Sequence, residues 1–170
     1  IALARAAGTR IAVTAGSPDR IRRCLELGAD LALDHHTDDI AGALREATGG
    51  TGADVVMDCV GGATLAANLD ALRTGGRLVQ IGLMGGARSE LDLRTLMSRR
   101  LTLIGSTLRS RSEAEKGDIV AAFLARFGEP LRGGELRPVI HAELPLERAA
   151  EAHRILESGE VFGKLALRVG

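Results

Sequence analysis

The chain is 170 residues long, 45% hydrophobic and 26% charged, which is the composition of an ordinary folded globular domain. Its 22 basic and 22 acidic residues cancel, and this balance argues against a nucleic-acid or membrane-surface binder, which needs excess positive charge. Three phenylalanines stand without any Tyr or Trp, so the chain offers almost no stacking platform for single-stranded nucleic acid.

The chain opens with a helix that lacks a start signal. Residues 1–7 are strong helix formers that end at Gly8, yet they carry no N-cap and no acidic first turn. We therefore expect the chain to be a piece of a longer polypeptide, cut inside a helix.

Short apolar runs alternate with amphipathic ones over most of the chain. The second helix shows the clearest signals, since Ser17 is suited to cap it, Pro18 to open it and Gly28 to end it. The predicted strands cover residues 10–14, 31–33, 55–60, 77–81 and 101–104, and the predicted helices cover residues 17–27, 38–47, 64–72, 91–97 and 113–127. This alternation is typical of an α/β fold with a doubly wound, parallel, Rossmann-like sheet that helices cover on both faces.

The pattern changes near residues 131–134, where two glycines interrupt it. Beyond this point we predict a strand at residues 136–142, a helix at residues 146–157 and a final strand at residues 164–169. These elements do not continue the alternation in a simple way, so we expect them to pack on another region.

The glycines do not form a dinucleotide fingerprint. No G-x-G-x-x-G stands between a strand and a helix, and Gly50-Thr51-Gly52 precedes a strand, which favours a turn. If Ile1 belongs to the helix after the first strand of such a fold, the fingerprint would precede Ile1, and its absence here carries no information.

The loop after the first predicted strand carries Thr14-Ala15-Gly16-Ser17, where folds that prefer NAD place an acidic residue. This loop leaves room for the 2′-phosphate of NADPH, which Ser17 and Arg20 could bind at the helix N-terminus. In the alternative interpretation Ser17 only caps the helix, and Arg20, Arg22 and Arg23 face water. The residues alone favour neither interpretation.

Two further strand ends could complete a pocket. They are Asp58-Cys59-Val60-Gly61-Gly62 and Ile81-Gly82-Leu83-Met84-Gly85-Gly86. Ligands of open α/β sheets lie beyond the carboxyl ends of the strands, where glycine lets a flat ring approach the backbone. Alternatively, both segments are ordinary tight turns. Because no histidine partner stands near Cys59 in the sequence, we interpret it as a packed strand-end thiol and not as a nucleophile.

The histidines do not indicate a metal site. His35 and His36 stand beside acidic residues, but neighbouring residues of an extended segment point opposite ways, which favours a polar loop. His141 and His153 stand alone and are expected at the surface. Two cysteines are too few for a disulfide framework or a four-cysteine zinc site, and they fit a reduced, cytoplasmic setting. No apolar run is long enough to span a bilayer.

Several short motifs, each weak alone, stand in an order that is specific. They are residues 1–8, Ala15-Gly16-Ser17 with Arg20, Leu27-Gly28-Ala29, Asp58-Cys59-Val60-Gly61-Gly62, Gly82-Leu83-Met84-Gly85-Gly86, Leu108-Arg109-Ser110-Arg111 and Gly163-Lys164. Over nearly the whole chain they resemble the cofactor domain of the medium-chain dehydrogenases/reductases. Within that superfamily the chain is similar to the zinc-free NADPH:quinone oxidoreductases, close to the p53-inducible quinone reductase group.

This resemblance implies a division of the chain and a set of cofactor contacts. Residues 1–136 would form the Rossmann NADP-binding domain without its first strand and glycine-rich loop, and residues 137–170 would return to the catalytic domain. His35 stands where relatives carry a Tyr beside the adenine ribose, and the family often has Lys in place of Arg20. The cofactor-binding residues implied by position are Ser17, Arg20, His35, Cys59, Leu83, Met84, Ser106, Leu108 and Lys164.

The implied chemistry is hydride transfer from NADPH to a quinone or a similar conjugated carbonyl, with no side chain of this chain acting as acid, base or nucleophile. The resemblance also implies a homodimer formed through the sheet edge, and no metal, nucleic-acid or membrane partner. Alone, the chain is expected to lack reductase activity. The alternatives are another medium-chain reductase (an enoyl reductase or a zinc alcohol dehydrogenase) and a non-enzymatic Rossmann binding module.

Overall fold

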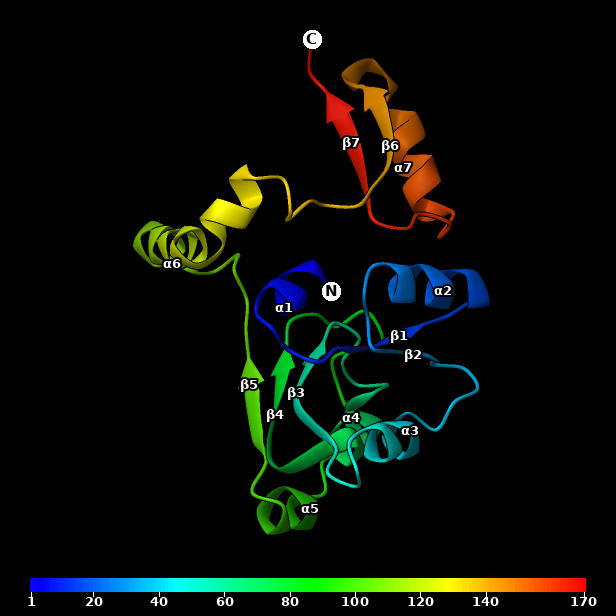
Figure 1. Ribbon diagram of the computed structural model, residues 1–170, viewed down its shortest axis with the longest axis vertical. Coiled ribbons are helices and arrows are strands. Elements are labelled where there is room, and N and C mark those ends of the chain that lie inside the picture. The colour runs from blue at the N-terminus through cyan, green and yellow to red at the C-terminus, as the bar shows by residue number, and fades with distance from the viewer.

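The computed structural model describes residues 1–170 and arranges them in two parts with a long helix beside them (Figure 1). Residues 1–105 contain five strands and residues 140–168 contain two. Every paired strand runs parallel to its neighbour. The expected parallel α/β architecture is therefore confirmed.

The larger part alternates strands and helices in the predicted order. Its elements are α1 (Ala2–Ala6), β1 (Ala12–Ala15), α2 (Pro18–Glu26), β2 (Leu31–Asp34), α3 (Ile40–Ala47), β3 (Ala53–Asp58), α4 (Leu65–Ala71), β4 (Leu72–Gln80), α5 (Leu93–Ser98) and β5 (Thr102–Gly105). Most bounds differ from the predicted ones by one or two residues, which is the usual uncertainty at the ends of elements. Gly50 and Gly52 lie in the turn before β3, as predicted, and both have positive φ.

Helix α2 has the start and stop that its sequence indicates. Ser17 takes the extended backbone of an N-cap, Pro18 is the first helical residue, and Gly28 follows the helix with φ at 90°. Only glycine adopts that left-handed conformation without strain, so the chain can turn directly from α2 into β2.

Strands β3, β4 and β5 form one parallel sheet in that order. Its core is a cluster of four buried leucines, and a second small cluster joins α3 to α4. The buried leucines are Leu69, Leu72, Leu78 and Leu101. They come from α4, from β4 and from the residue before β5, so α4 packs on the sheet through aliphatic side chains.

The doubly wound sheet is interrupted. Strands β1 and β2 pair only with each other, and no hydrogen-bonded strand joins them to β3. One face of β3 is also uncovered, because Val55 and Met57, which point to the same face, are 44% and 70% exposed. In the common Rossmann strand order one further strand stands between these two sheets.

Strand β4 corrects the prediction that Gly75-Gly76 closes the preceding helix. The strand begins at Leu72, pairs there with Ala53, and continues through the two glycines to Gln80. The register shifts between Ala53 and Val55, so the glycines form an irregularity inside the strand. Leu72 is only 1% exposed, and its burial against β3 holds the early part of the strand in place.

Helix α6 (Glu113–Arg132) begins at a capping box in which Ser112 and Glu115 satisfy each other's backbone amides. We predicted its end before Gly128, but the helix continues through Gly128 and Pro130. A proline near the C-terminal end removes only one helical hydrogen bond, and the chain bends there, as the yellow turn of Figure 1 shows.

The smaller part is a β-α-β unit, which confirms the predicted order of strand, helix and strand. It consists of β6 (Ile140–Pro145), the short 3₁₀ turn η1 (Leu146–Arg148), α7 (Ala149–Glu157) and β7 (Lys164–Arg168). The strand predicted at residues 136–142 is wrong by about four residues. Leu136 is buried, but its amide donates to the Pro130 carbonyl at 3.0 Å, so it belongs to the turn after α6.

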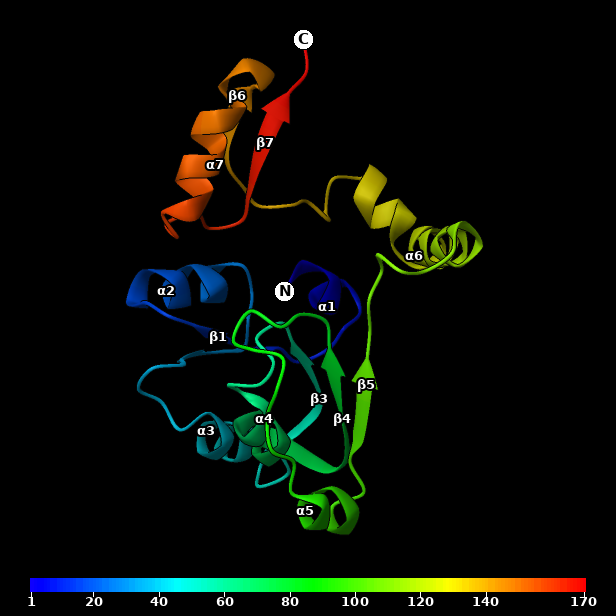
Figure 2. The ribbon, with the colours of Figure 1, turned by 180° about the vertical axis from the view of Figure 1, so that it is seen from behind.

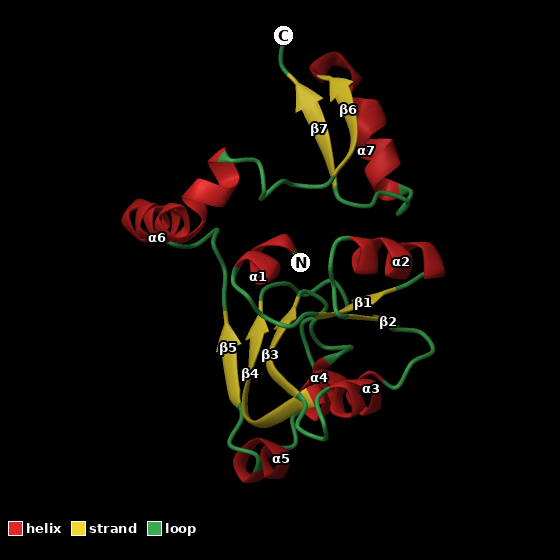
Figure 3. Ribbon diagram, viewed as in Figure 1, coloured by secondary structure: helices red, strands yellow, loops and turns green.

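The two parts are joined by a single extended loop from α6 to β6 (Figure 3). Seen from behind, β6 and β7 stand on one side of α7, and α2 is the helix of the larger part that lies below α7 (Figure 2). None of the helices has the length and apolar character that a membrane crossing requires.

Candidate functional site

Ser17 and His35, two of the predicted cofactor residues, lie at the carboxyl ends of β1 and β2, and Arg20 follows in the first turn of α2. The two strands pair so that Ala15 lies level with Asp34, which places Ser17 and His35 just beyond them. His35 donates its backbone amide to the Ala15 carbonyl at 3.1 Å. A Cβ atom on Gly16 would lie 2.8 Å from His35 Cε1, so glycine lets the imidazole lie close against the backbone here. We name Ser17, Arg20 and His35 the adenosine corner.

Ser17 has a structural task at this corner. Its hydroxyl oxygen accepts a hydrogen bond from the Arg20 amide at 3.4 Å and so caps α2. A hydroxyl that accepts one amide still carries its own O–H donor. Ser17 thus caps the helix, and its O–H donor stays available to an anion.

The arginines of α2 do not share one environment. Arg22 forms ion pairs with Asp19 and with Glu26, on an exposed surface. The Arg20 guanidinium instead contacts the carbonyl of Gly159 and that of Val161, the latter at 3.2 Å. The interpretation that all three arginines face water is therefore wrong for Arg20.

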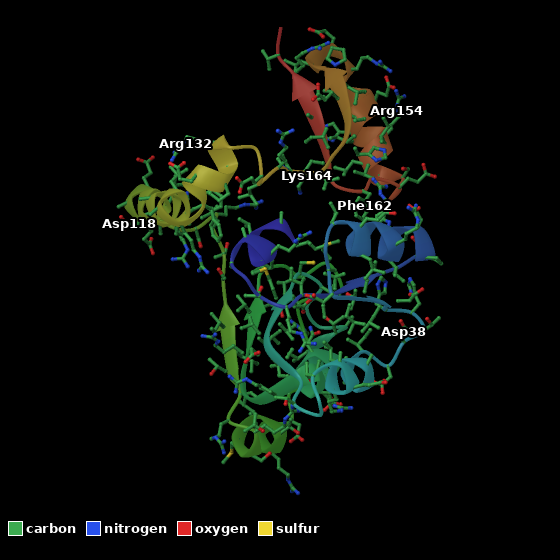
Figure 4. The ribbon with its side chains drawn as sticks, in the orientation of Figure 1. Asp38, Asp118, Arg132, Arg154, Phe162 and Lys164 are labelled. Atoms are coloured by element: carbon green, nitrogen blue, oxygen red, sulfur yellow. The ribbon has the colours of Figure 1, made fainter.

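Arg23 also contacts the C-terminal part of the chain. Its guanidinium carbon lies 4.0 Å from the centre of the Phe162 ring, in a cation–π arrangement. Figure 4 shows Phe162 at the end of the smaller part that lies next to α2. Both arginines thus join α2 to the loop between α7 and β7.

A second group of predicted residues lies on two glycine-containing loops, Cys59–Gly62 after β3 and Ile81–Gly86 after β4. The loops are joined by backbone hydrogen bonds: Gly62 to the Gly86 carbonyl at 2.8 Å, Gly85 to Val60 at 2.7 Å and Met84 to Cys59 at 3.2 Å. We name this pair of loops the glycine ledge.

Close approach of the two backbones requires the glycines of the ledge. A Cβ atom on Gly62 would lie 2.3 Å from the Arg88 carbonyl oxygen, and one on Gly82 would lie 2.8 Å from the Cys59 carbonyl. Gly61 also has φ at 93°, in the left-handed region. The loops are therefore built by backbone contact, which leaves their side chains free.

The side chains of the ledge are exposed. Met84 is 85% exposed and Leu83 is 55% exposed, and Cys59 is also exposed. The prediction of a packed thiol at Cys59 is wrong, because the backbone of the partner loop, and not side-chain packing, covers this strand end. The exposed apolar groups form a surface on which a flat ring could lie.

Asp58 anchors the ledge from below. It is 5% exposed, and its carboxylate accepts hydrogen bonds from the Val60 amide at 2.7 Å, the Gly61 amide at 2.9 Å and the Thr64 hydroxyl at 3.0 Å. Burial by itself raises the pKa of Asp58, but the bonds from Val60, Gly61 and Thr64 outweigh it and hold the pKa below the ordinary aspartate value.

A hollow of about 500 Å³ opens beside the ledge, beyond the ends of β4 and β5. Two of the predicted residues, Ser106 and Leu108, line it together with Ile81, Thr107 and Arg109. The amide of Ser106 donates to the Gln80 carbonyl at 2.9 Å, which continues the sheet pattern one residue past β5. The hollow thus belongs to the same carboxyl edge of the sheet.

Lys164 is not brought into either group. It is exposed at the start of β7, where its amide donates to the Val139 carbonyl at 2.9 Å. No hydrogen bond or ion pair joins its side chain to the rest of the chain. In Figure 4 it lies at the end of the smaller part that is nearest the N-terminus.

The histidines are exposed, as predicted, but the prediction that His35 and His36 point opposite ways is wrong, because their rings lie side by side. His35 and His36 are exposed, their ring centres are 4.1 Å apart, and the His36 amide donates to the Asp34 carboxylate. His141 and His153 are exposed. No three His, Cys, Asp or Glu side chains are arranged to hold a metal ion.

Two features of the site were not predicted from the sequence. We singled out the motif that begins at Asp58 but did not assign Asp58 an anchoring role, although Thr64, six residues later, was a detectable signal for a buried polar anchor. The contact between α2 and Phe162 had no local signal, because its partners are more than 130 residues apart in the chain.

Comparison with known proteins places this geometry in a family. The family model described as zinc-binding dehydrogenase matches residues 1–124, which is more than half of the chain. A human quinone oxidoreductase is 31% identical over 166 residues, covering 97% of this chain and 49% of that protein. The chain thus spans about half the length of the curated relatives it matches.

Solved structures agree with this assignment. An NAD-dependent alcohol dehydrogenase is 38% identical with a TM-score of 0.81, covering 99% of this chain and 46% of that chain. A mycobacterial protein solved with NADPH is 26% identical with a TM-score of 0.77, covering 98% and 52%. The chain therefore belongs to the zinc-binding dehydrogenase family of medium-chain dehydrogenases/reductases and is similar to its quinone oxidoreductases.

Proposed function

We propose that this chain is the cofactor-binding portion of an NADPH-dependent quinone oxidoreductase. The observation that carries the proposal is that two surfaces, the adenosine corner and the glycine ledge, both lie at the carboxyl ends of parallel strands. Open α/β sheets bind dinucleotides at such strand ends. The similarity to quinone oxidoreductases, and to a structure that contains NADPH, supports the same assignment.

Each surface would receive a different half of the cofactor. Ser17 and Arg20 would bind the 2′-phosphate, with the N-terminus of α2 adding a favourable field for the anion. His35 would lie against the adenine ribose. Cys59, Leu83 and Met84 on the ledge would face the nicotinamide side, and Ser106 and Leu108 would border it from the hollow.

The bound cofactor supplies hydride transfer, here to a quinone or a similar conjugated carbonyl. The chain supplies position: the backbone contacts of the ledge hold an exposed apolar surface, and Asp58 holds the ledge. No side chain of these residues is assigned an acid, base or nucleophile role. Lys164 would reach the cofactor from β7.

The architecture suggests a larger assembly. Residues 1–136 would be the Rossmann domain, with a further strand filling the space between β1 and β3, and residues 137–170 would belong to the catalytic domain. Leu103 and Ile104 are 39% and 40% exposed on the edge strand β5, and they would form the interface of a homodimer. The two free cysteines favour a reducing, cytoplasmic setting.

A second candidate is an alcohol dehydrogenase of the same family. The 38% identity to an NAD-dependent alcohol dehydrogenase favours it. The metal of the family's name has no ligand set among residues 1–170, so no step on this chain is derived through zinc. The uncharged loop at Gly16 and Ser17 favours NADPH over NAD, since it lacks the acidic residue that binds the ribose hydroxyls.

Calorimetric titration of the chain with 2′,5′-ADP and with 5′-AMP tests the cofactor assignment. We expect tighter binding of 2′,5′-ADP, and we expect Arg20→Ala to remove the difference, because it removes the cation at the phosphate. Arg22→Ala is the matched control, since that guanidinium already pairs with two carboxylates. Equal binding of both ligands would shift the assignment to NAD.

A further inference from the structure

The loop between α7 and β7, residues 158–163, is a defined structure that sits on α2. Gly159 and Gly163 have positive φ, at 74° and 99°, and the Ser158 hydroxyl bonds the Ile155 carbonyl and accepts the Glu160 amide. We name residues 158–163 the α7–β7 loop. Its glycines and its own hydrogen bonds fix the directions of its carbonyl groups.

Two carbonyls of this loop hold the guanidinium of Arg20. Both contacts, to Gly159 and to Val161, use the same nitrogen, Nη2. A guanidinium carries five N–H donors, so those on Nε and Nη1 remain without a partner in the chain. The loop therefore fixes the position of Arg20 without exhausting its capacity to bind an anion.

Charge singles out Arg20 among the three arginines of α2. Arg22 has carboxylates at Asp19 and Glu26, and Arg23 lies 4.0 Å from the Asp19 carboxylate. Arg20 has only neutral carbonyl partners, so its positive charge is not cancelled by a neighbour. It is the cation of α2 that gains most from an incoming phosphate.

We propose that the α7–β7 loop is a specificity element for the cofactor's 2′-phosphate. It holds Arg20 in the place where the phosphate binds, and the phosphate in turn stabilises the loop on α2. Such coupling is reciprocal, because two groups that favour the same guanidinium position favour each other. This inference rests on the proposed function, and it makes cofactor selectivity depend on residues at the other end of the chain.

Phe162 allows a test that leaves every ligand contact intact. Phe162→Ala removes the ring that seats the loop against Arg23. We expect the dissociation constant for 2′,5′-ADP to rise about three- to tenfold, the effect of freeing one rotamer-rich side chain, while that for 5′-AMP stays unchanged. Phe123→Ala on α6 is the matched control, because it deletes the same ring where it packs on Phe127.

A second variant guards against misfolding of the first. Arg23→Gln removes the cation above Phe162 and keeps most of the side-chain stem, so it opens no cavity. It should lower the preference for 2′,5′-ADP in the same direction as Phe162→Ala. Arg20→Lys keeps the charge but not the planar donor set, so it should still favour 2′,5′-ADP and lose sensitivity to Phe162→Ala.

Amide hydrogen exchange of the loop measures the coupling from its other side. Saturating 2′,5′-ADP should slow exchange at residues 158–163 by the same three- to tenfold factor, and saturating 5′-AMP should not. If 2′,5′-ADP is preferred but Phe162→Ala, Arg23→Gln and loop exchange show no coupling, this inference is wrong while the proposed function stands. If 2′,5′-ADP speeds loop exchange, phosphate and loop compete and the inference is also wrong. If neither nucleotide binds, both proposals fall.

Discussion

The carboxylate of Asp58 accepts a hydrogen bond from the Thr64 hydroxyl at 3.0 Å. Its two oxygens also accept hydrogen bonds from the amides of Val60 and Gly61, in the loop between Asp58 and Thr64. Strand β3, the loop and the start of α4 are thus tied at one buried point. Because the carboxylate is the acceptor for both loop amides, its ionisation state controls how firmly the ledge is held.

Asp58→Asn should lower the free energy of unfolding at pH 7 by about 1–3 kcal/mol, since a neutral amide replaces a charged acceptor. The pKa of Asp58 is lowered in the fold, so this stabilisation is fully present above the unfolded-state pKa of about 4 and is lost as the pH falls through the lower folded-state pKa. Urea unfolding between pH 7 and pH 3 should show the difference between variant and parent shrinking at the acid end.

Asp54→Asn is the control for that series. Asp54 pairs with Arg73 on an exposed surface, where such a pair contributes about 0–1 kcal/mol. A difference for Asp58→Asn that does not change with pH would contradict the anchoring role of the carboxylate.

Gly62→Ala should destabilise the protein although it adds only a methyl group. The added Cβ would meet the Arg88 carbonyl at 2.3 Å, and backbone on both sides must move, at a cost of about 1–3 kcal/mol. Gly105→Ala is the comparison, because nothing lies within 4 Å of its added Cβ. Thermal unfolding of both variants measures the difference, and equal melting temperatures would refute the close contact.

Ser17→Ala separates capping from cofactor binding. Loss of the cap should cost about 0.5–2 kcal/mol without any ligand present, and Ser17→Gly should cost only a few tenths, because glycine tolerates the N-cap position. If the hydroxyl also donates to the 2′-phosphate, both variants should weaken 2′,5′-ADP equally while differing in stability. If the affinity for 2′,5′-ADP instead falls in proportion to the loss of stability, Ser17 only caps the helix.

Leu72→Ala tests the start of β4. This side chain is 1% exposed within the leucine cluster, so its removal should cost about 2–5 kcal/mol. Leu156→Ala, at a position that is 57% exposed on α7, should change the unfolding midpoint in urea little. A small effect at Leu72 would mean that the early part of β4 does not depend on it.

Local signals predicted the elements that local interactions determine. Ser17, Pro18 and Gly28 set the ends of α2, and the structure has them in those roles. The end of α6 was predicted wrongly because Gly128 and Pro130 are usual helix breakers, yet a helix tolerates both in its final turns. Strand β6 was predicted about four residues too early because the apolar Leu136 is buried in the turn after α6 and does not belong to a strand.

Contacts between distant segments could not be predicted in the same way. The exposure of Cys59 follows from backbone bonds to a loop that begins more than twenty residues later. The partners of Arg20 lie 139 and 141 residues away. The motif order identified the family and the strand ends of the site, but not which side chains the fold had already engaged there.

The separation of β1–β2 from β3–β4–β5 has a consequence for affinity. A dinucleotide that reached both the adenosine corner and the glycine ledge would connect two sheets that share no strand hydrogen bond. Its second half would then bind at an effective concentration set by how rigidly the sheets are spaced. The ratio of the affinity for the whole dinucleotide to the affinity for its adenosine half therefore reports how rigidly the two sheets are held relative to each other.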